Sequence, residues 1–175
     1  MIGQRWGVTP AEIAMRLPCD GAASGAAVVC DRAVPVDAAP QLVFDWLCQL
    51  RVAPYSYDLL DNFGRHSPPG RTPELTELAV GQRFMTLFEL VDFTPGTRIT
   101  LRARAAVVTY AVHPGPAPGT SRLHARVRFP GPPWLLALPV LGDFLMMRKQ
   151  LLTLKALAER EARSSIWSRV RPGHR

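Results

Sequence analysis

The chain has 175 residues, of which 47% are hydrophobic, which excludes a disordered protein and favours one folded domain with a substantial core. Its formal net charge of +7 permits attraction to nucleic acid, anionic lipid or acidic partners. Cys19, Cys30 and Cys48 show no Cys-x-x-Cys spacing, so we predict free, mostly buried thiols, with neither a disulfide nor a thiolate metal site.

The N-terminal region combines a helix signal with scattered charges. Because charged residues interrupt residues 1–25, we expect no signal peptide and a cytoplasmic protein. Thr9 supplies a capping hydroxyl, Pro10 suits the first helical position, and Glu12 completes a capping box. These residues predict a short helix that ends at about Leu17.

A strand and an amphipathic helix are predicted next. Residues 26–36 carry valines between turn-prone segments, which is typical of a strand. In residues 39–50, Val43, Trp46 and Leu47 recur at the steps that place side chains on one helical face. We therefore predict a helix directly after the strand.

Prolines and glycines then divide the chain into a loop and a set of strands. Residues 67–73 contain three prolines and predict a surface loop. Residues 80–129 read as strands separated by turns at 92–96 and 113–120, where proline and glycine gather. This segment therefore predicts an antiparallel sheet.

Two of these strands show a clean alternation of apolar and polar residues. Residues 98–102 and 122–129 alternate as a half-buried antiparallel sheet requires, whereas residues 105–112 are apolar on both faces. The outer face would carry Arg98, Arg102, Arg122, Arg126 and Arg128. No aromatic residue interleaves them to stack on bases, so we expect a solvated convex face and no nucleic-acid partner.

The C-terminal part predicts a long helix over residues 134–158. Its apolar stripe consists of Val140, Phe144, Met147, Leu151, Leu154 and Ala158. Pro139, Gly142 and Asp143 interrupt the apolar run, which is too short for a membrane span. Residues 134–138, together with the arginine-rich end of the chain, are candidates for contact with a membrane surface.

This order of elements is an α+β arrangement: a curved antiparallel β-sheet wrapped around a long C-terminal α-helix, with two short helices after the first strand. We expect an N-terminal extension with a short helix over residues 1–25, the main domain over 26–162 and a basic tail over 163–175. A curved sheet cannot lie flat on one helix over its whole width. A cavity between them is therefore expected.

Several short motifs occur in an order that points to a known fold. They are residues 5–12 with Leu17, Pro18 and Asp20; residues 32–37 with Ala39, Pro40, Trp46 and Leu47; residues 55–58 with Asn62; residues 73–75 with Val80 and Gly81; and residues 142–155. On these residues the chain resembles the START/Bet v 1-like (SRPBCC) superfamily, in particular bacterial polyketide cyclase/dehydrase-like and lipid-transport-like proteins. The resemblance implies a helix-grip fold, with an apolar ligand held between the sheet and the C-terminal helix.

The chain departs from this pattern at three places. Cys19 stands where such relatives usually have glycine, the approach to the tyrosine motif is reduced to residues 52–54, and the connection over residues 81–90 is short. A shorter connection would narrow the mouth of the cavity.

A polar cluster follows the predicted helix and has two interpretations. Tyr55, Tyr57, Asp58 and Asn62 place phenol, carboxylate and carboxamide groups close together in the sequence. They would either bind a ligand at the cavity or hold local structure, with the Asx side chains bonding nearby backbone.

Apolar residues predicted to face the cavity complete the candidate ligand site. With Tyr55, Tyr57 and Asn62, they are Phe84, Phe88, Tyr110, Trp134, Phe144, Met147 and Leu151. An ordinary core uses the same residue types, so a core remains the alternative interpretation.

Catalytic residues are not assigned, because no nucleophile, base and orienting group occur together. His113, Tyr110 and Asp58 are the candidates for proton transfer. The four histidines are scattered and no glycine-rich phosphate loop opens a helix, so we predict no metal and no cofactor.

The leading hypothesis is binding of a small hydrophobic molecule such as a lipid, polyketide or isoprenoid. The alternatives are a polyketide cyclase or dehydratase that uses the same cavity, and a basic module that binds nucleic acid or acidic partners.

Overall fold

A computed structural model describes residues 3–22, 27–55 and 70–170 of the chain. Within these ranges, seven strands form one sheet in the order β1-β2-β7-β6-β5-β4-β3. They are β1 (Arg5–Trp6), β2 (Ala27–Val36), β3 (Arg83–Phe84), β4 (Phe88–Thr94), β5 (Arg98–Ala103), β6 (Ala106–Pro114) and β7 (Ser121–Pro130). Every neighbouring pair is antiparallel except β1 and β2, which are parallel.

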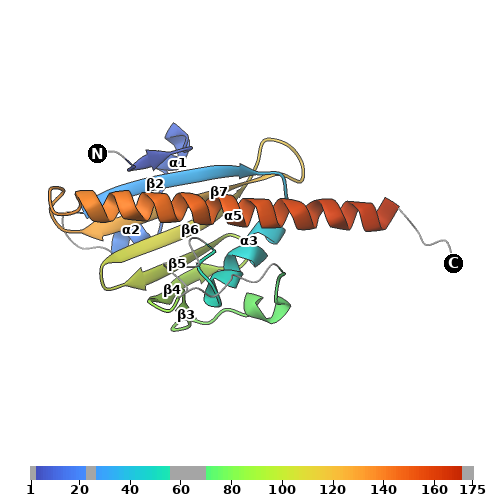
Figure 1. The fold of residues 1–175 in the computed structure, drawn as a ribbon, viewed down its shortest axis with the longest axis horizontal. Helices are drawn as coiled ribbons and strands as arrows, with labels where there is room; N and C mark the ends of the chain where they lie inside the picture. Colours follow the sequence, from blue (N-terminus) through green and yellow to red (C-terminus); the bar gives the residue numbers. More distant parts are fainter. Residues whose placement is uncertain (1–2, 23–26, 56–69, 171–175) are drawn as a thin grey trace.

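The long helix α5 (Ala137–Val170) crosses one face of this sheet (Figure 1). The helix α3 (Pro40–Cys48), extended by a 3₁₀ turn over Gln49–Arg51, packs beside it, and a second 3₁₀ turn spans Pro73–Thr76. The other face carries the short helices α1 (Pro10–Ala14) and α2 (Cys19–Ala22). The predicted helix-grip α+β fold is thereby confirmed.

The main core lies between the sheet and the two helices α3 and α5. Along β2, β6 and β7 alternate residues point into this core, as the two-residue period of a strand requires. On α5 the residues Val140, Met147, Leu151, Leu154 and Ala158 of the predicted stripe are all buried. Burial of this stripe against the sheet therefore fixes the rotation of α5 about its axis.

The predicted short elements have the expected local causes. The side chain of Thr9 accepts a hydrogen bond from the backbone N–H of Glu12, and the Glu12 carboxylate accepts one from the Thr9 N–H. Helix α3 begins at Pro40 and buries Trp46 and Leu47 as predicted. Of the two short helices expected after the first long strand, α3 is observed, and the segment that would hold the other falls largely outside the described residues.

Strand β1, helix α2 and the full length of α5 were not predicted. Strand β1 has only two residues, and α2 only four, so neither leaves a periodic pattern in the sequence. Helix α5 continues to Val170, through residues that were assigned to the basic tail. Within the described residues, no helix is both long and apolar enough to cross a membrane.

The prediction of a solvated convex face is wrong for the part of the sheet formed by β2 and β7. Arg126 is only 4% exposed and lies under the N-terminal segment. Its Nε donates to Asp31 on β2 at 2.7 Å, and its Nη atoms donate to Asp20 and to backbone carbonyls of α1, including that of Ile13. Arg122 and Arg128 pair with Glu12 and Asp20.

Acidic partners from three segments thus neutralise these arginines. Sequence alternation correctly placed the arginines on the outer face, but it could not show which segment covers that face. Arg102 on β5 remains exposed, and Arg98 pairs with Asp92 on β4 at 3.5 Å.

Candidate functional site

A cavity of about 450 Å³ lies between the sheet and the first half of α5. Its wall is formed by β4, β5, β6 and β7, by α5, and by the turn between β3 and β4. The lining residues are Pro54, Met85, Thr86, Leu87, Phe88, Ala103, Ala105, Ala106, Val108, Tyr110, Val127, Phe129, Asp143, Met146, Met147 and Gln150. Most are apolar, as in pockets that hold small organic molecules.

Small residues account for the open space. Ala103, Ala105 and Ala106 line the cavity at the β5–β6 turn, where larger side chains would fill it. Met146 and Met147 face them from α5, and methionine side chains adapt readily to irregular ligands.

The turn between β3 and β4 has an unusual backbone. Met85 and Thr86 are non-glycine residues with φ of 46° and 64°, in the left-handed region that costs such residues free energy. Residues 85–88 all line the cavity, so the strained backbone occurs where the chain forms the cavity wall.

A chain of buried hydrogen bonds crosses the inner wall. The Tyr110 hydroxyl donates to Oε1 of Gln150 at 2.6 Å, and Nε2 of Gln150 donates to the carbonyl of Pro54 at 2.6 Å and to Sδ of Met85 at 3.2 Å. Burial raises the pKa of the Tyr110 phenol well above its usual range, and the nearby Asp143 carboxylate adds to this effect. The phenol therefore stays protonated and acts as a hydrogen-bond donor.

An ion pair between a strand and the long helix lies next to this network. Arg32 on β2 is completely buried and binds Asp143 on α5, while its Nε and Nη2 donate to the carbonyl of Gly3 at 3.3 and 3.1 Å. Its guanidinium carbon lies 5.6 Å from the centroid of the Phe144 ring. Burial raises the pKa of the Asp143 carboxyl, and Arg32 opposes that rise.

The structure brings only part of the predicted ligand site together. Phe88, Tyr110 and Met147 line the cavity. Phe84 and Leu151 are buried in the core next to it, and neither reaches its wall.

The other predicted aromatic residues lie elsewhere. Trp134 is 78% exposed at the start of the α5 region. Phe144 packs against Arg32 and Gly3. Tyr55 is buried and packs edge-on against Trp46 with ring centroids 6.1 Å apart, and Tyr57, Asp58 and Asn62 lie outside the described residues.

The two catalytic candidates among the described residues, Tyr110 and His113, lie on opposite faces of the sheet. Tyr110 points to the cavity, whereas His113 belongs to the outward-facing set of β6 residues and lies near His124, with ring centroids 6.3 Å apart. Burial lowers the pKa of His113, and His124 contributes to the same shift.

Asp143, Gln150 and Met85 are cavity residues that the sequence analysis did not select. Asp143, Met147 and Gln150 follow one another at steps of four and three, so they share one face of the helix. That spacing was available in the sequence, but Asp143 was interpreted as an interruption of the apolar run and as part of the motif over residues 142–155, not as a cavity residue.

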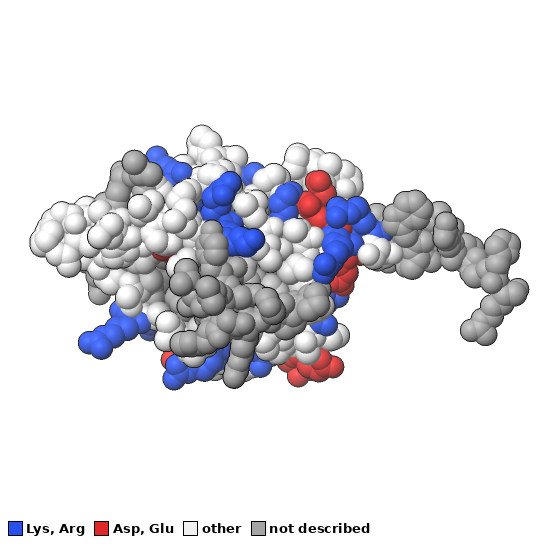
Figure 2. Space-filling view, viewed as in Figure 1, with Lys and Arg blue, Asp and Glu red and all other residues white. Residues whose placement is uncertain are grey.

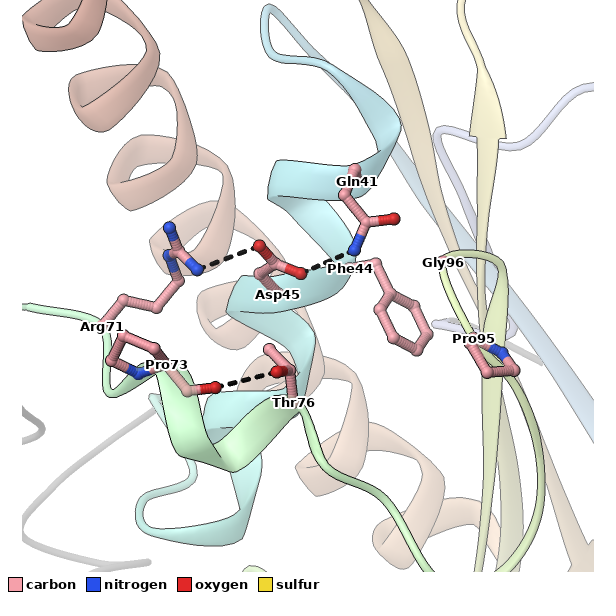
Figure 3. Close-up of a pocket in the computed structure, with 8 residues that line it drawn as sticks. All are labelled: Gln41, Phe44, Asp45, Arg71, Pro73, Thr76, Pro95 and Gly96. Atoms are coloured by element: carbon pink, nitrogen blue, oxygen red, sulfur yellow. Dashed lines mark hydrogen bonds and ion pairs between the residues drawn. The ribbon is translucent and has the colours of Figure 1, made fainter.

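A second hollow lies beside α3 and is polar (Figure 3). Arg71 donates to Asp45 at 2.9 Å, Gln41 donates to the other oxygen of Asp45 at 2.8 Å, and Thr76 donates to the carbonyl of Pro73 at 2.8 Å (Figure 3). Arg71 also binds Glu161 on α5 at 2.7 Å. These polar groups bind one another, and through Arg71 they join α3 to α5.

Potential metal ligands and reactive thiols are not gathered in either hollow. Among the described residues, no three His, Cys, Asp or Glu side chains are grouped as a metal site. Cys19, Cys30 and Cys48 are all buried with free thiols. Burial raises the pKa of Cys30 to about 11 and of Cys48 to about 12, which makes both thiols poor nucleophiles.

Solved structures of several bacterial proteins resemble this fold. A protein from Nitrosospira multiformis matches with a TM-score of 0.54 at 13% identity, over 77% of this chain and 99% of that one. Protein CV1439 from Chromobacterium violaceum matches with a TM-score of 0.48 at 16% identity, over 75% and 96% of the two chains. The Polyketide_cyc-like protein Cgl2372 from Corynebacterium glutamicum matches with a TM-score of 0.42 at 12% identity, over 86% and 99%.

No family model and no curated protein sequence matches the chain. At these identities the structural matches concern the fold alone. The chain therefore shares its fold with the Nitrosospira multiformis protein over 77% of its length.

Proposed function

We propose that this protein binds a small hydrophobic molecule, of the lipid, polyketide or isoprenoid kind, in the cavity between the sheet and α5. The observation that carries the proposal is the cavity itself, whose volume of about 450 Å³ lies within the range of small-molecule sites. Its wall combines apolar side chains with the few polar groups of Thr86, Tyr110, Gln150 and Asp143.

Binding has more support than catalysis. Tyr110 is the only one of the three proton-transfer candidates that lines the cavity in the described part of the chain, and its raised pKa keeps the proton on the phenol. A general acid or base works best with a pKa near the working pH. A cyclase or dehydratase that uses this cavity is therefore the second candidate.

Nucleic-acid binding has less support than either. A basic footprint requires arginines that are free to contact phosphates. Arg122, Arg126 and Arg128 are instead committed to Glu12, Asp20 and Asp31.

We further propose that the end of the molecule at which α5 begins contacts a membrane surface. Exposed large apolar residues occur just before α5 and in its first turns, and also on the β3–β4 turn: Trp134, Leu135, Leu138, Leu141 and Leu145, with Leu87. We call this set the apolar rim. That end, on the left in Figure 2, carries few charged side chains.

Two observations connect the apolar rim to ligand binding and to lipid. Leu87 belongs to both the rim and the cavity wall, and Met146, which follows Leu145 on α5, is 37% exposed and also lines the cavity. Exposed Arg148 and Lys149 follow the rim on α5 and are suited to anionic headgroups.

Binding in the cavity is tested by filling it. We expect Ala106→Phe, which places a ring in the cavity, to weaken binding of the neutral fluorescent probe N-phenyl-1-naphthylamine by at least about tenfold. Ala156→Phe, on the exposed side of α5, is the matched control and should leave binding unchanged. Equal binding by both variants and the unmodified protein, with melting temperatures retained, would place the probe outside this cavity.

Native mass spectrometry supplies a second test that does not depend on a chosen probe. A small molecule that co-purifies with the unmodified protein but not with Ala106→Phe supports the proposal. A molecule retained equally by both proteins contradicts its placement.

Membrane contact is tested by vesicle flotation. The protein should float with vesicles that contain phosphatidylglycerol, and Leu138→Ser with Leu141→Ser should remove this binding. Val80→Ser, at a 64% exposed valine outside the rim, is the control. Flotation that persists in the rim variant would contradict the proposed contact surface.

A further inference from the structure

The hydrogen-bond donors of Tyr110 and Gln150, on the inner wall of the cavity, are already in use. The Pro54 carbonyl can only accept, which orients the Gln150 amide with Nε2 towards it. The second N–H of Gln150 points to Sδ of Met85 at 3.2 Å, and its Oε1 accepts from the Tyr110 hydroxyl at 2.6 Å. Neither Tyr110 nor Gln150 therefore has a donor left for a ligand.

Asp143, in contrast, offers a hydrogen-bond acceptor to the cavity. Its Oδ2 accepts from Nη1 of Arg32, and no hydrogen bond from the described residues reaches its Oδ1. The side chain is 25% exposed and forms part of the cavity wall. The cavity wall thus contains a free acceptor oxygen, on a carboxylate whose other oxygen is bound by Arg32.

Arg32 is not available to bind an anionic ligand. Its side chain is 0% exposed, it does not belong to the cavity wall, and its Nε and Nη2 are bound to the Gly3 carbonyl. An anion in the cavity would meet the Asp143 carboxylate before the guanidinium, and two like charges at short range are unfavourable. The Arg32 charge also neutralises Asp143, so a cationic ligand is not required.

We propose that the cavity selects neutral apolar molecules with a hydroxyl group, a phenol or an alcohol, which donates a hydrogen bond to Oδ1 of Asp143. This inference rests on the proposed function and adds the chemical class of the ligand. A ligand without a donor removes water from Asp143 and leaves the carboxylate oxygen unpaired, which costs binding free energy. A site built for one donor therefore discriminates strongly against analogues that lack it.

Three probes of similar shape test the selection. Isothermal titration at pH 7 compares 1-naphthol, which donates a hydrogen bond, with 1-methoxynaphthalene, which does not, and with 1-naphthoate, which is an anion. We expect 1-naphthol to bind about tenfold or more tightly than 1-methoxynaphthalene, as a hydrogen bond to a charged acceptor predicts, and 1-naphthoate to bind most weakly.

The variants remove or invert the acceptor. Arg32→Met with Asp143→Leu removes the whole ion pair, since removal of one partner would leave a buried charge. In this variant the preference for 1-naphthol should disappear, while 1-methoxynaphthalene binds as before. Asp92→Asn with Arg98→Gln removes a pair on the outer part of the sheet and is the control that keeps the preference.

Asp143→Asn gives a sharper result. Arg32 is a donor and holds the amide oxygen, so the amide nitrogen turns to the cavity and offers N–H groups instead of an oxygen. The preference should reverse, with 1-naphthoate now binding more tightly than 1-naphthol. A thermal melt of each variant establishes that it is folded.

Each remaining outcome is decisive. Equal binding of 1-naphthol and 1-methoxynaphthalene to the unmodified protein, or tighter binding of 1-naphthoate, overturns the inference and leaves the proposed function intact. Failure of all three probes to bind counts against the proposed function as well. A preference for 1-naphthol that survives both Asp143 variants places the donor contact at another residue.

Discussion

The hydroxyl of Tyr110 on β6 lies 2.6 Å from Oε1 of Gln150 on α5, and the two side chains join the sheet to the helix along the wall of the cavity. Tyr110 is 1% exposed and Gln150 4% exposed. Buried polar groups of this kind are stable only when each finds a partner. The arrangement therefore holds one wall of the cavity in place. It also occupies the hydrogen-bond donors of Tyr110 and Gln150, which are then not free to bind a ligand.

Loss of the Tyr110–Gln150 hydrogen bond should destabilise the fold. We expect Gln150→Leu to lower the free energy of unfolding by roughly 2–4 kcal/mol, because it leaves the Tyr110 hydroxyl and the Pro54 carbonyl buried without a partner. Urea denaturation measures the change. Thr153→Val on the same helix, which removes an exposed hydroxyl bonded to the Lys149 carbonyl, should change stability by no more than about 0.5 kcal/mol. Similar losses in the two variants would show that the buried link is unimportant.

Removal of Arg126 from the outer face of the sheet should also lower the free energy of unfolding by a large amount. Arg126→Met leaves the Asp31 carboxylate buried beside His124 and removes the donors that bind the carbonyls of α1, so we expect a loss of about 3–5 kcal/mol in the free energy of unfolding. Hydrogen exchange should accelerate over residues 10–15. Arg102→Met, at an exposed position on β5, is the control. Unchanged exchange in the Arg126 variant would contradict the role assigned to this arginine.

Acid should weaken the attachment of the N-terminal segment through Glu12. Burial opposes ionisation of Glu12, but hydrogen bonds from Arg122 and Thr9 outweigh it and lower its pKa from 4.5 to about 2. Since the pKa is lower in the folded chain, Glu12 stabilises the fold above pH 4.5, and this contribution is lost as the pH falls from 4.5 towards 2.

Equilibrium unfolding at several pH values between 7 and 2 tests this dependence. Glu12→Gln should be less stable at pH 7 by roughly 1–3 kcal/mol and should lose less stability on acidification. The exposed Glu89→Gln variant serves as the control. A variant whose curve runs parallel to that of the unmodified protein would assign the acid sensitivity to other carboxylates.

The pairing of β1 with β2, which was not predicted from the sequence, requires a residue without a side chain at Gly7. Its φ is 68°, and a Cβ at this position would lie 2.1 Å from the backbone oxygen of Ala33. Gly7→Ala should therefore separate β1 from β2 and lower the melting temperature by several degrees. Gly119→Ala shares a positive φ of 75° but meets no atom within 4 Å, and it isolates the cost of backbone strain alone. Equal effects of the two substitutions would contradict the close approach at Gly7.

Local sequence signals predicted the elements that have local causes. The capping box of Thr9 and Glu12, the proline at the start of α3 and the stripe along α5 all operate within a few residues of the chain, and each is observed. The long strands were found by their alternation, because one face of each is buried in the main core.

Contacts between distant segments could not be read in the same way. The pairing of Arg122 with Glu12 spans 110 residues, and that of Arg126 with Asp31 spans 95. A polar residue on a strand indicates only the face to which it points. Whether water or a folded-back N-terminal segment covers that face depends on the whole tertiary structure.

The residues of the cavity were likewise only partly predictable from the sequence. Apolar and aromatic residues were predicted to line the cavity, yet Phe84 and Leu151 lie in the core next to it, and Trp134 is exposed. The open space instead depends on the small side chains of Ala103, Ala105 and Ala106, and small residues leave little signal in a hydrophobic pattern.

The five methionines permit the most direct test of ligand binding in the cavity. Met85, Met146 and Met147 line the wall, whereas Met15 packs on the outer face of the sheet against the cluster of Leu17 and Cys19. In protein labelled with ¹³C at the methionine methyl groups, N-phenyl-1-naphthylamine should shift the signals of Met85, Met146 and Met147 and leave that of Met15 in place. At saturating probe, unchanged signals from the three cavity methionines would contradict the account, and so would a shift confined to Met15.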